Sequence, residues 1–313
     1  MKWPVSRSLA EESMLMLQQW DPRNANLQIY INGDLIHRDQ AGISPFDSLV
    51  QGGDGVWEGL RVYPNGIFKL EAHLQRLIDS AIAMGFDGIP SMNDLREAIR
   101  VTLDANHMSD GVHIRLTLSR GTKMTSGMDP RLNQSGPTLI VLAEHKAPVY
   151  DTEGLSLITS SIRRFRPDML DPRIHHNNLI QSILAKIEAN HANADDALML
   201  DDRGFIAETN ATHLFFVRSG TVYTSRLMAC PAGITRSVVL KLCTDHDIPC
   251  AEEDLSQAFA YAADECFCTG TMGELAAVTS IDGRKVGDGK PGPLTARLQA
   301  LFTQAVEIEC EMP

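Results

Sequence analysis

No run in this chain of 313 residues approaches the roughly 18 apolar residues that a membrane-spanning helix requires, so we expect no membrane segment. No apolar run follows Lys2 and Arg7, so we expect no secretory signal. Cysteine is also scarce, and the six cysteines lie between residues 230 and 310, mostly inside apolar runs. This pattern favours reduced, buried thiols in a cytoplasmic protein over a disulfide framework or a metal site.

Positive charge is also in short supply. The chain has 28 lysines and arginines against 40 aspartates and glutamates, which gives a formal net charge of −12. A chain this acidic is not expected to bind nucleic acid or an anionic membrane, although a local basic pocket for a small anion is still allowed. Its hydrophobic fraction of 43 % is ordinary for a globular protein, and its length suits two domains or one large one.

The first half of the chain predicts hairpins and helices. Residues 1–26 are expected to be an N-terminal extension with one short helix over 9–20. Asn32-Gly33 and the turn Pro64-Asn65-Gly66 each separate two strand-like runs, which is typical of β-hairpins. Further elements are expected as helices over 70–84 and 91–106 and as strands over 112–118 and 139–143. Residues 27–145 therefore predict a small α+β domain.

Residues 146–154 are polar and rich in turn-forming residues, so we expect an interdomain linker there. Residues 155–313 are then a second, larger domain. Its expected strands cover 155–160, 197–200, 213–217 and 265–269. Its expected helices cover 178–192, 235–246 and 293–306.

One turn leads directly into a predicted helix, at Gly233-Ile234-Thr235. The first N–H groups of a helix have no partner within it, and together with the helix dipole they suit a phosphate. A simple N-cap role for Thr235 is the plainer alternative. A second turn, over 269–274, ends a predicted strand and also offers hydroxyls and backbone donors.

Two charged residues are candidates for binding a ligand with both an anionic and a basic group. Arg76 lies on the predicted helix 70–84, where a guanidinium can bind phosphate oxygens in a bidentate manner. Glu208 falls between two apolar strands, where a carboxylate needs a cationic or N–H partner. A ring nitrogen of a cofactor would be such a partner; otherwise Glu208 faces water at a strand edge, and Arg76 is an ordinary surface arginine.

Taken in order, these stretches resemble a known family over about residues 27–302. The family is that of the class IV, or fold type IV, pyridoxal-phosphate aminotransferases, which include the branched-chain and D-amino-acid aminotransferases and aminodeoxychorismate lyase. The matching stretches are 31–33, 53–61, 71–77, 183–189, 197–201, 207–209, 233–236, 270–271 and 281–283. The resemblance implies an α+β fold with a small N-terminal domain, a larger β-barrel-like C-terminal domain with helices, and a homodimer.

The resemblance also implies a role for individual residues. The phosphate of pyridoxal or pyridoxamine phosphate would be held by Arg76, Ile234, Thr235 and Thr271. Glu208 would hold the pyridine nitrogen protonated, with Thr209 and Asn210 in the turn beside the ring. The substrate, an amino acid or a 2-oxo acid, would meet Arg115, Trp57, Gly270 and Met272.

The chain departs from the family pattern at the lysine that bonds covalently to the cofactor. Without gaps, His175 falls on that position, and a shift of two residues places Arg173 there instead. Lys186 matches a different lysine of the family, on a helix. Imidazole forms no stable imine with an aldehyde, and arginine is a poor nucleophile, so we expect non-covalent binding of the cofactor. Imidazole remains suited to general acid–base catalysis.

Three functions follow from these residues. The first is an aminotransferase that moves an amino group between an amino acid and a 2-oxo acid, with His175 in the place of lysine. The second is a lyase or isomerase of the same fold. The third is a protein that binds a phosphorylated small molecule without catalysis.

Overall fold

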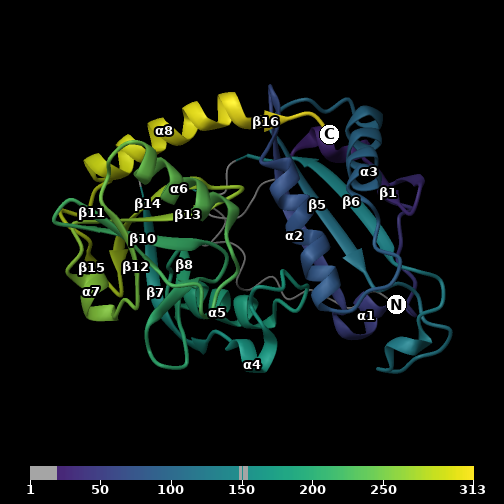
Figure 1. Ribbon diagram of the computed structural model, residues 1–313, viewed down its shortest axis with the longest axis horizontal. Helices are drawn as coiled ribbons and strands as arrows, with labels where there is room; N and C mark the ends of the chain where they lie inside the picture. The colour runs from purple at the N-terminus through teal and green to yellow at the C-terminus, as the bar shows by residue number, and fades with distance from the viewer. Residues whose placement is uncertain (1–19, 148–149, 151–153) are drawn as a thin grey trace.

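The computed structural model describes residues 20–147, 150 and 154–313, and within them the strands form two sheets that lie side by side (Figure 1). The helix expected over 9–20 lies outside the described residues, apart from its last residue. In the described part of the chain no helix is long and apolar enough to cross a membrane.

The first sheet has seven strands in the order β16-β4-β3-β5-β6-β1-β2. The strands are β1 (Gln28–Ile31), β2 (Asp34–His37), β3 (Gly55–Tyr63), β4 (Gly66–Phe68), β5 (Val112–Ser119), β6 (Thr138–His145) and β16 (Cys310–Glu311). The accompanying helices are η2 (Pro22–Asn26), α1 (Ser48–Gly52), α2 (Leu70–Ala83), α3 (Met92–Ala105) and η3 (Pro130–Leu132).

Both hairpins expected from the sequence are present. Strands β1 and β2 pair in antiparallel register around Asn32 and Gly33, whose φ angles are 49° and 103°. Positive φ at both central residues is the type I′ geometry that Asn-Gly adopts readily. Strands β3 and β4 pair across a turn at Pro64 and Asn65, and Gly66, the first residue of β4, has a φ of 120°. The local turn chemistry therefore sets the register of these strands.

Helices α2 and α3 cover one face of the first sheet. Strand β3 alternates, so that Val56, Leu60 and Val62 are buried against these helices while Trp57 and Gly59 face the other way. Helix α3 begins with a capping box in which Ser91 and Asp94 bond each other's backbone N–H groups. One face of the sheet is thereby fixed by apolar packing, and the other is left for the second half of the chain.

The second sheet has nine strands, with β12-β11-β10-β13-β14-β7-β8-β9 in order and β15 paired with β14. The strands are β7 (Leu155–Arg163), β8 (Asp196–Leu200), β9 (Ile206–Thr209), β10 (His213–Arg218), β11 (Thr221–Ser225), β12 (Cys250–Glu253), β13 (Glu265–Gly270), β14 (Glu274–Ile281) and β15 (Arg284–Lys285). The helices are α4 (Pro167–Leu170), α5 (Ile180–His191), α6 (Ile234–Asp245), α7 (Gln257–Tyr261) and α8 (Pro293–Glu309).

This sheet is buried on both faces. In β10, Leu214 and Phe216 join an inner cluster with Cys266 and Cys268, while Phe215 and Val217 pack outward under α6 and α8. Helix α5 covers β7 and β8 through Ala185 and Ala189. Near-continuous apolar runs are what a sheet buried on both faces requires. The inner cluster within a curled sheet agrees with the β-barrel-like architecture expected for this half.

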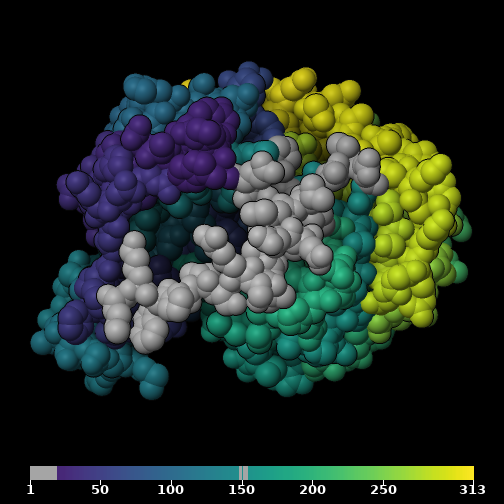
Figure 2. All heavy atoms as spheres, turned by 180° about the vertical axis from the view of Figure 1, so that it is seen from behind, coloured from purple at the N-terminus to yellow at the C-terminus, as the bar shows by residue number. Residues whose placement is uncertain are grey.

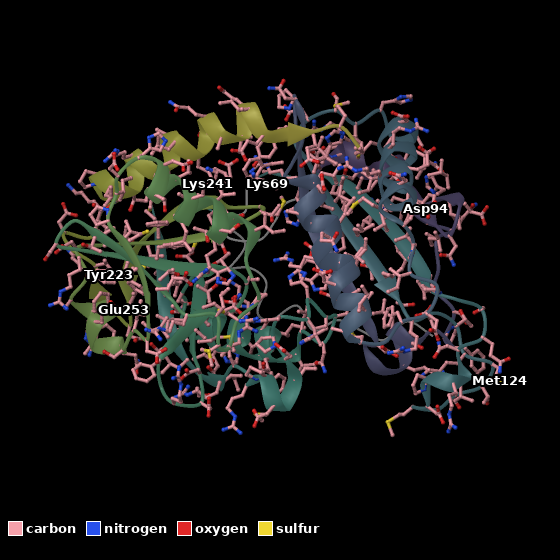
Figure 3. All side chains as sticks on the ribbon, viewed as in Figure 1. Lys69, Asp94, Met124, Tyr223, Lys241 and Glu253 are labelled. Carbon is pink, nitrogen blue, oxygen red and sulfur yellow. The ribbon has the colours of Figure 1, made fainter. Side chains whose placement is uncertain are left out.

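The last strand of the chain joins the first sheet and not the second. Helix α8 runs from the second sheet toward the first, and β16 then pairs with β4 through Cys310 and Phe68 (Figure 1). Lys69, labelled in Figure 3, forms an ion pair with Glu309 at the end of α8. From behind, the surface is hollowed between the two halves (Figure 2).

Candidate active site

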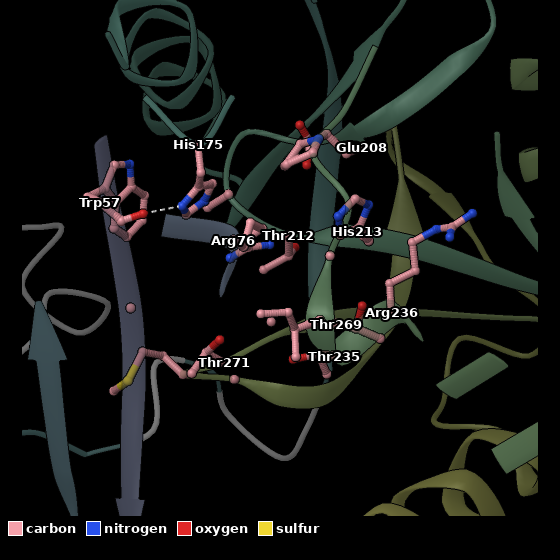
Figure 4. Close-up of a pocket in the computed structure, with 18 of the residues that line it drawn as sticks. Trp57, Arg76, His175, Glu208, Thr212, His213, Thr235, Arg236, Thr269 and Thr271 are labelled. Atoms are coloured by element: carbon pink, nitrogen blue, oxygen red, sulfur yellow. Dashed lines mark hydrogen bonds between the residues drawn. The ribbon is translucent and has the colours of Figure 1, made fainter. Parts of the chain in front are cut away.

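A cavity of about 280 Å³ lies between the two sheets and is lined from both. The first sheet and α2 contribute Trp57, Gly59, Arg76 and His113. The second half contributes His175, Glu208, Thr212, His213, Ile234, Thr235, Arg236, Thr269, Thr271 and Met272 among others (Figure 4). Many of the residues predicted to bind ligand therefore meet in one place.

One end of the cavity is suited to an anion. Helix α6 begins there at Ile234, and its N-cap, Gly233, has no side chain to occupy the first N–H groups of the helix. Arg76 reaches this helix start, where its Nη1 donates to the carbonyl oxygen of Ala232 at 2.8 Å. The buried hydroxyl of Thr269 has no hydrogen-bond partner among the described residues. Helix N–H groups, the guanidinium of Arg76 and the Thr269 hydroxyl therefore meet at this end, and each can donate to an anion.

The other end of the cavity holds a buried carboxylate. Glu208 lies in β9, with its side chain 4 % exposed, and not at a strand edge facing water. Its Oε1 is 2.7 Å from Nη2 of Arg164 but accepts no hydrogen bond from a described residue. Burial raises the pKa of Glu208 to about 7, although Arg164 and Arg76 oppose this. A donor from a ligand would satisfy the oxygen.

His175 lines the cavity, and its side chain is 18 % exposed. Its segment runs antiparallel beside β3, because Trp57 N donates to His175 O at 3.0 Å and Asn177 N donates to Gly55 O at 2.8 Å. The His175 ring stacks on Trp57, with ring centroids 4.4 Å apart. Burial lowers the pKa of His175 to about 4, so its imidazole is neutral at pH 7.

Four predicted site residues do not line the cavity. Arg173 is exposed to solvent. The guanidinium of Arg115 lies 3.4 Å from the centre of the Trp57 ring and donates to Asn177 Oδ1. Thr209 and Asn210 shape the turn after Glu208: the Thr209 hydroxyl accepts from Thr212 N, and Asn210 Oδ1 accepts from Ala197 N.

Lys186 also lies away from the cavity. Its ammonium group contacts the carbonyl oxygen of Asp195 and lies 3.2 Å from a carboxylate oxygen of Asp196. The described residues that line the cavity include no lysine. The histidine at position 175 therefore has no lysine neighbour within this lining.

Sequence reasoning missed several residues of the cavity region. Arg164 sits beside Glu208, and His213 and Arg236 line the cavity. His213 is buried next to Arg236, and burial lowers its pKa to about 3. A signal was present for His213 and Arg236, because each is a polar residue in an apolar strand or at a helix start. No comparable signal links Arg164 to Glu208, which lies 44 positions later.

Gly233 is expected to tolerate no larger side chain. A Cβ at this position would lie 2.3 Å from Cδ2 of the buried His213 ring. We expect Gly233→Ala to lower the free energy of unfolding by about 1–3 kcal/mol, as overpacking does, and to weaken binding of inorganic phosphate. Urea unfolding and calorimetry measure the two effects. Gly42→Ala is the control, since its Cβ would meet nothing within 4 Å; equal stability of the two variants would contradict the expectation.

Most of the chain is similar to proteins of one known family. The family model described as "Amino-transferase class IV" matches residues 55–281. The branched-chain-amino-acid aminotransferase-like protein 1 of Arabidopsis thaliana is 51 % identical over 287 residues, covering 91 % of this chain and 52 % of that protein. The chain thus spans about half the length of this relative.

Other relatives match over nearly their whole length. A putative branched-chain-amino-acid aminotransferase of Methanocaldococcus jannaschii is 37 % identical over 277 residues, covering 88 % of this chain and 95 % of that protein. The crystal structure of the branched-chain amino acid aminotransferase of T.th. complexed with N-(5'-phosphopyridoxyl)-L-glutamate superposes with a TM-score of 0.84 at 31 % identity, covering 91 % and 95 % of the two chains. The expected fold type IV architecture is confirmed, and the chain belongs to the class IV aminotransferase family.

Proposed function

We propose that this chain binds pyridoxal or pyridoxamine phosphate without a covalent bond and moves an amino group between an amino acid and a 2-oxo acid. The observation that carries the proposal is that one cavity has a hydrogen-bond acceptor at one end and hydrogen-bond donors at the other. Glu208 presents a buried carboxylate oxygen without a hydrogen-bond donor, and the start of α6 presents donors without an acceptor. A ligand with a basic ring nitrogen and a phosphate complements both ends.

The residues present fit the cofactor of this family. Arg76, Ile234, Thr235 and Thr271 would hold its phosphate, and Glu208 would accept a hydrogen bond from its pyridine nitrogen. The unpartnered hydroxyl of Thr269 lies in the same lining. When bound, the pyridine ring supplies an electron sink for the substrate carbon that exchanges its proton.

His175 is proposed as the acid–base group of the reaction. It occupies the cavity lining, it is neutral at pH 7 because burial lowers its pKa to about 4, and an imidazole can accept and return a proton. Trp57, Gly270 and Met272 line the same cavity and are proposed to contact the substrate. Arg115 does not line the cavity, and we propose that it influences substrate binding only through its contact with the Trp57 ring.

The proposal is tested by mixing the protein with pyridoxamine phosphate and a panel of 2-oxo acids and measuring the amino acid formed. We expect one equivalent of amino acid for each equivalent of pyridoxamine phosphate consumed. We also expect dialysis to remove the cofactor and borohydride to trap none on the protein. Cofactor bound irreversibly to the chain would contradict the non-covalent part of the proposal.

The same experiment separates the alternatives. Elimination or isomerisation of the substrate without net amino transfer would identify a lyase or isomerase of this fold. Tight binding of pyridoxamine phosphate with no chemistry on any oxo acid would identify a binding protein. Failure to bind either form of the cofactor would contradict the aminotransferase and the lyase or isomerase, and would favour a protein that binds another phosphorylated small molecule.

We also propose that residues 27–145 and 155–313 act as two domains around the cavity and that the chain forms a homodimer. The support for a dimer is an apolar stripe on α5. Ile180, Ile183, Leu184 and Ile187 are between 43 % and 60 % exposed and follow the i, i+3, i+4, i+7 spacing of one helix face. The opposite face of α5 packs on the second sheet.

Placing charge on this stripe is expected to dissociate the dimer. We expect Ile183→Asp combined with Ile187→Asp to raise the dimer dissociation constant roughly 100-fold or more, because buried carboxylates without partners are costly. Analytical ultracentrifugation measures this constant. Ile308→Asp is the matched control, since Ile308 is 81 % exposed on α8, outside the stripe. Dimers of equal strength in both proteins would show that α5 is not the interface.

A further inference from the structure

Glu58 is a charged residue in the apolar core of the first half. In β3 it lies on the same side as Val56, Leu60 and Val62, facing α2, and its side chain is 0 % exposed. An ionised carboxylate at such a position is costly unless it is paired and hydrogen-bonded. The residues that pair with the Glu58 carboxylate therefore indicate its role.

Two of these partners come from α2. Nε of Arg76 donates to Glu58 Oε1 and Nη2 to Oε2, each at 2.7 Å. His73 Nδ1 lies 2.7 Å from Oε2. Burial alone would raise the pKa of Glu58, but Arg76, His175 and His73 together lower it to about 2. The carboxylate is thus ionised and accepts all of these contacts.

The bidentate contact fixes the direction of Arg76. A guanidinium has five N–H donors in one plane. Two point at Glu58, and a third, on Nη1, donates to Ala232 O beside the start of α6. With the plane held at three points, the two remaining N–H groups are the ones free to meet an anion. Glu58 therefore orients the arginine that lies at the phosphate end of the cavity.

The same carboxylate faces His175. Its Oε1 lies 3.5 Å from His175 Nδ1, and the backbone oxygen of Trp57 lies 2.5 Å from the same nitrogen (Figure 4). Both oxygens only accept hydrogen bonds, so Nδ1 must carry the proton of a neutral ring. Nε2 then carries the lone pair, and it makes no hydrogen bond with a described residue while the ring lines the cavity.

The other charged groups around this ring come from α2. Arg76 and His73 both disfavour an added proton on His175, whereas Glu58 favours one. Because Glu58 is paired with Arg76 and His73, the carboxylate raises the pKa of the His175 imidazole less than an unpaired carboxylate would. The ring is therefore kept neutral while its orientation is held.

We propose that Glu58 is a positioning residue that aims Arg76 at the phosphate end of the cavity and, together with the Trp57 carbonyl, holds His175 as the tautomer with its bare Nε2 toward the ligand. The inference rests on the proposed function, because it gives His175 a proton-accepting atom and Arg76 an anion to bind. It adds a residue, Glu58, that contacts Arg76 and faces His175 but does not itself line the cavity.

The tautomer is tested in the ligand-free wild-type protein. Nitrogen-15 NMR of histidine-labelled protein distinguishes a protonated ring nitrogen from a bare one, and His175→Gln identifies the signals of His175. We expect a pyrrole-type Nδ1 and a pyridine-type Nε2 at pH 7. A proton on Nε2 would overturn the proposal. This measurement does not depend on cofactor binding, so a wild-type protein that binds no pyridoxamine phosphate would count against the proposed function alone.

The positioning role is tested with Glu58→Gln. We expect its dissociation constant for pyridoxamine phosphate to rise about tenfold or more, because charge-assisted contacts to Arg76 are lost, and the two nitrogen signals of His175 to move toward each other. Glu274→Gln is the matched control, a carboxylate 3.1 Å from Arg61 outside the cavity lining, and its affinity should stay within about twofold of wild type.

A conservative variant guards against a general loss of structure. Glu58→Asp keeps the charge but withdraws it by one methylene, so we expect it to restore the His175 tautomer while regaining only part of the affinity. Circular dichroism establishes that each variant is folded. A folded Glu58→Gln protein with wild-type affinity and wild-type nitrogen signals would overturn the proposal, and the tautomer measurement on the wild type decides independently if that variant does not fold.

Discussion

Replacing His175 with glutamine is expected to slow amino transfer by about 10²- to 10⁴-fold, the usual contribution of a positioned acid–base group. Glutamine has a similar reach but neither accepts nor returns a proton at neutral pH. The contacts at Glu208 and at the start of α6 are untouched, so the dissociation constant for pyridoxamine phosphate should change by only a few fold. Single-turnover rates and calorimetry measure the two quantities separately.

Two control substitutions sharpen this prediction. His176→Gln changes the same residue type one position further, where the side chain does not line the cavity, and should leave the rate near wild type. Arg173→Gln tests the alternative alignment in which Arg173 takes the place of lysine. Since Arg173 is exposed, we expect no large effect. A rate lost in the Arg173 variant but kept in the His175 variant would reverse the assignment.

Glu208→Gln has the second largest expected effect, and it should separate ligand binding from stability. The amide keeps the shape but not the charge that a protonated pyridine nitrogen would meet. We expect pyridoxamine phosphate to bind about 10- to 100-fold more weakly, since hydrogen bonds between charged groups are worth roughly 1.5–3 kcal/mol. Calorimetric titration measures the change. Wild-type affinity in this variant would place the ring nitrogen elsewhere.

The same substitution is expected to stabilise the ligand-free protein at alkaline pH. Burial raises the pKa of Glu208 from 4.5 to about 7, so the native state favours the protonated carboxyl. Stability that is present below pH 4.5 is therefore lost as the pH rises through 7. Glutamine does not ionise, so the variant does not lose stability in this way. We expect the difference in Tm between Glu208→Gln and wild type to be larger at pH 8 than at pH 5, measured by calorimetry without ligand.

Local signals accounted for most of the elements. Asn32-Gly33 predicted a hairpin because these residues adopt positive φ easily, and Pro64-Asn65-Gly66 predicted another because it separates two strand-like runs; both hairpins are present. The helix expected over 70–84 appears as α2, and that expected over 91–106 appears as α3. Short elements such as α1 carry too few residues for a periodic pattern. Strand β14 was missed because its run of small and apolar residues has no strict alternation.

Apart from the resemblance, the sequence indicates candidate site residues only where the signal lies nearby in the chain. Ile234 and Thr235 begin a helix, as the preceding glycine turn predicts, and a helix start is suited to an anion. Arg115 shows the limit: its strand was expected, but the ring of Trp57 on the neighbouring strand holds its guanidinium away from the cavity lining. The pairing of Arg164 with Glu208 depends on how β7 lies relative to β9, which no local pattern encodes.

The return of the chain to its first sheet limits how the molecule opens. Strand β16 is held against β4, and Arg96 Nη2 lies 2.9 Å from Glu311 Oε2. A hinge rotation that parted the two sheets would have to break that pairing or strain α8, which leads into it. We therefore expect a ligand bound without a covalent bond to enter and leave without a separation of the two sheets, so that its residence time is set by its contacts inside the cavity.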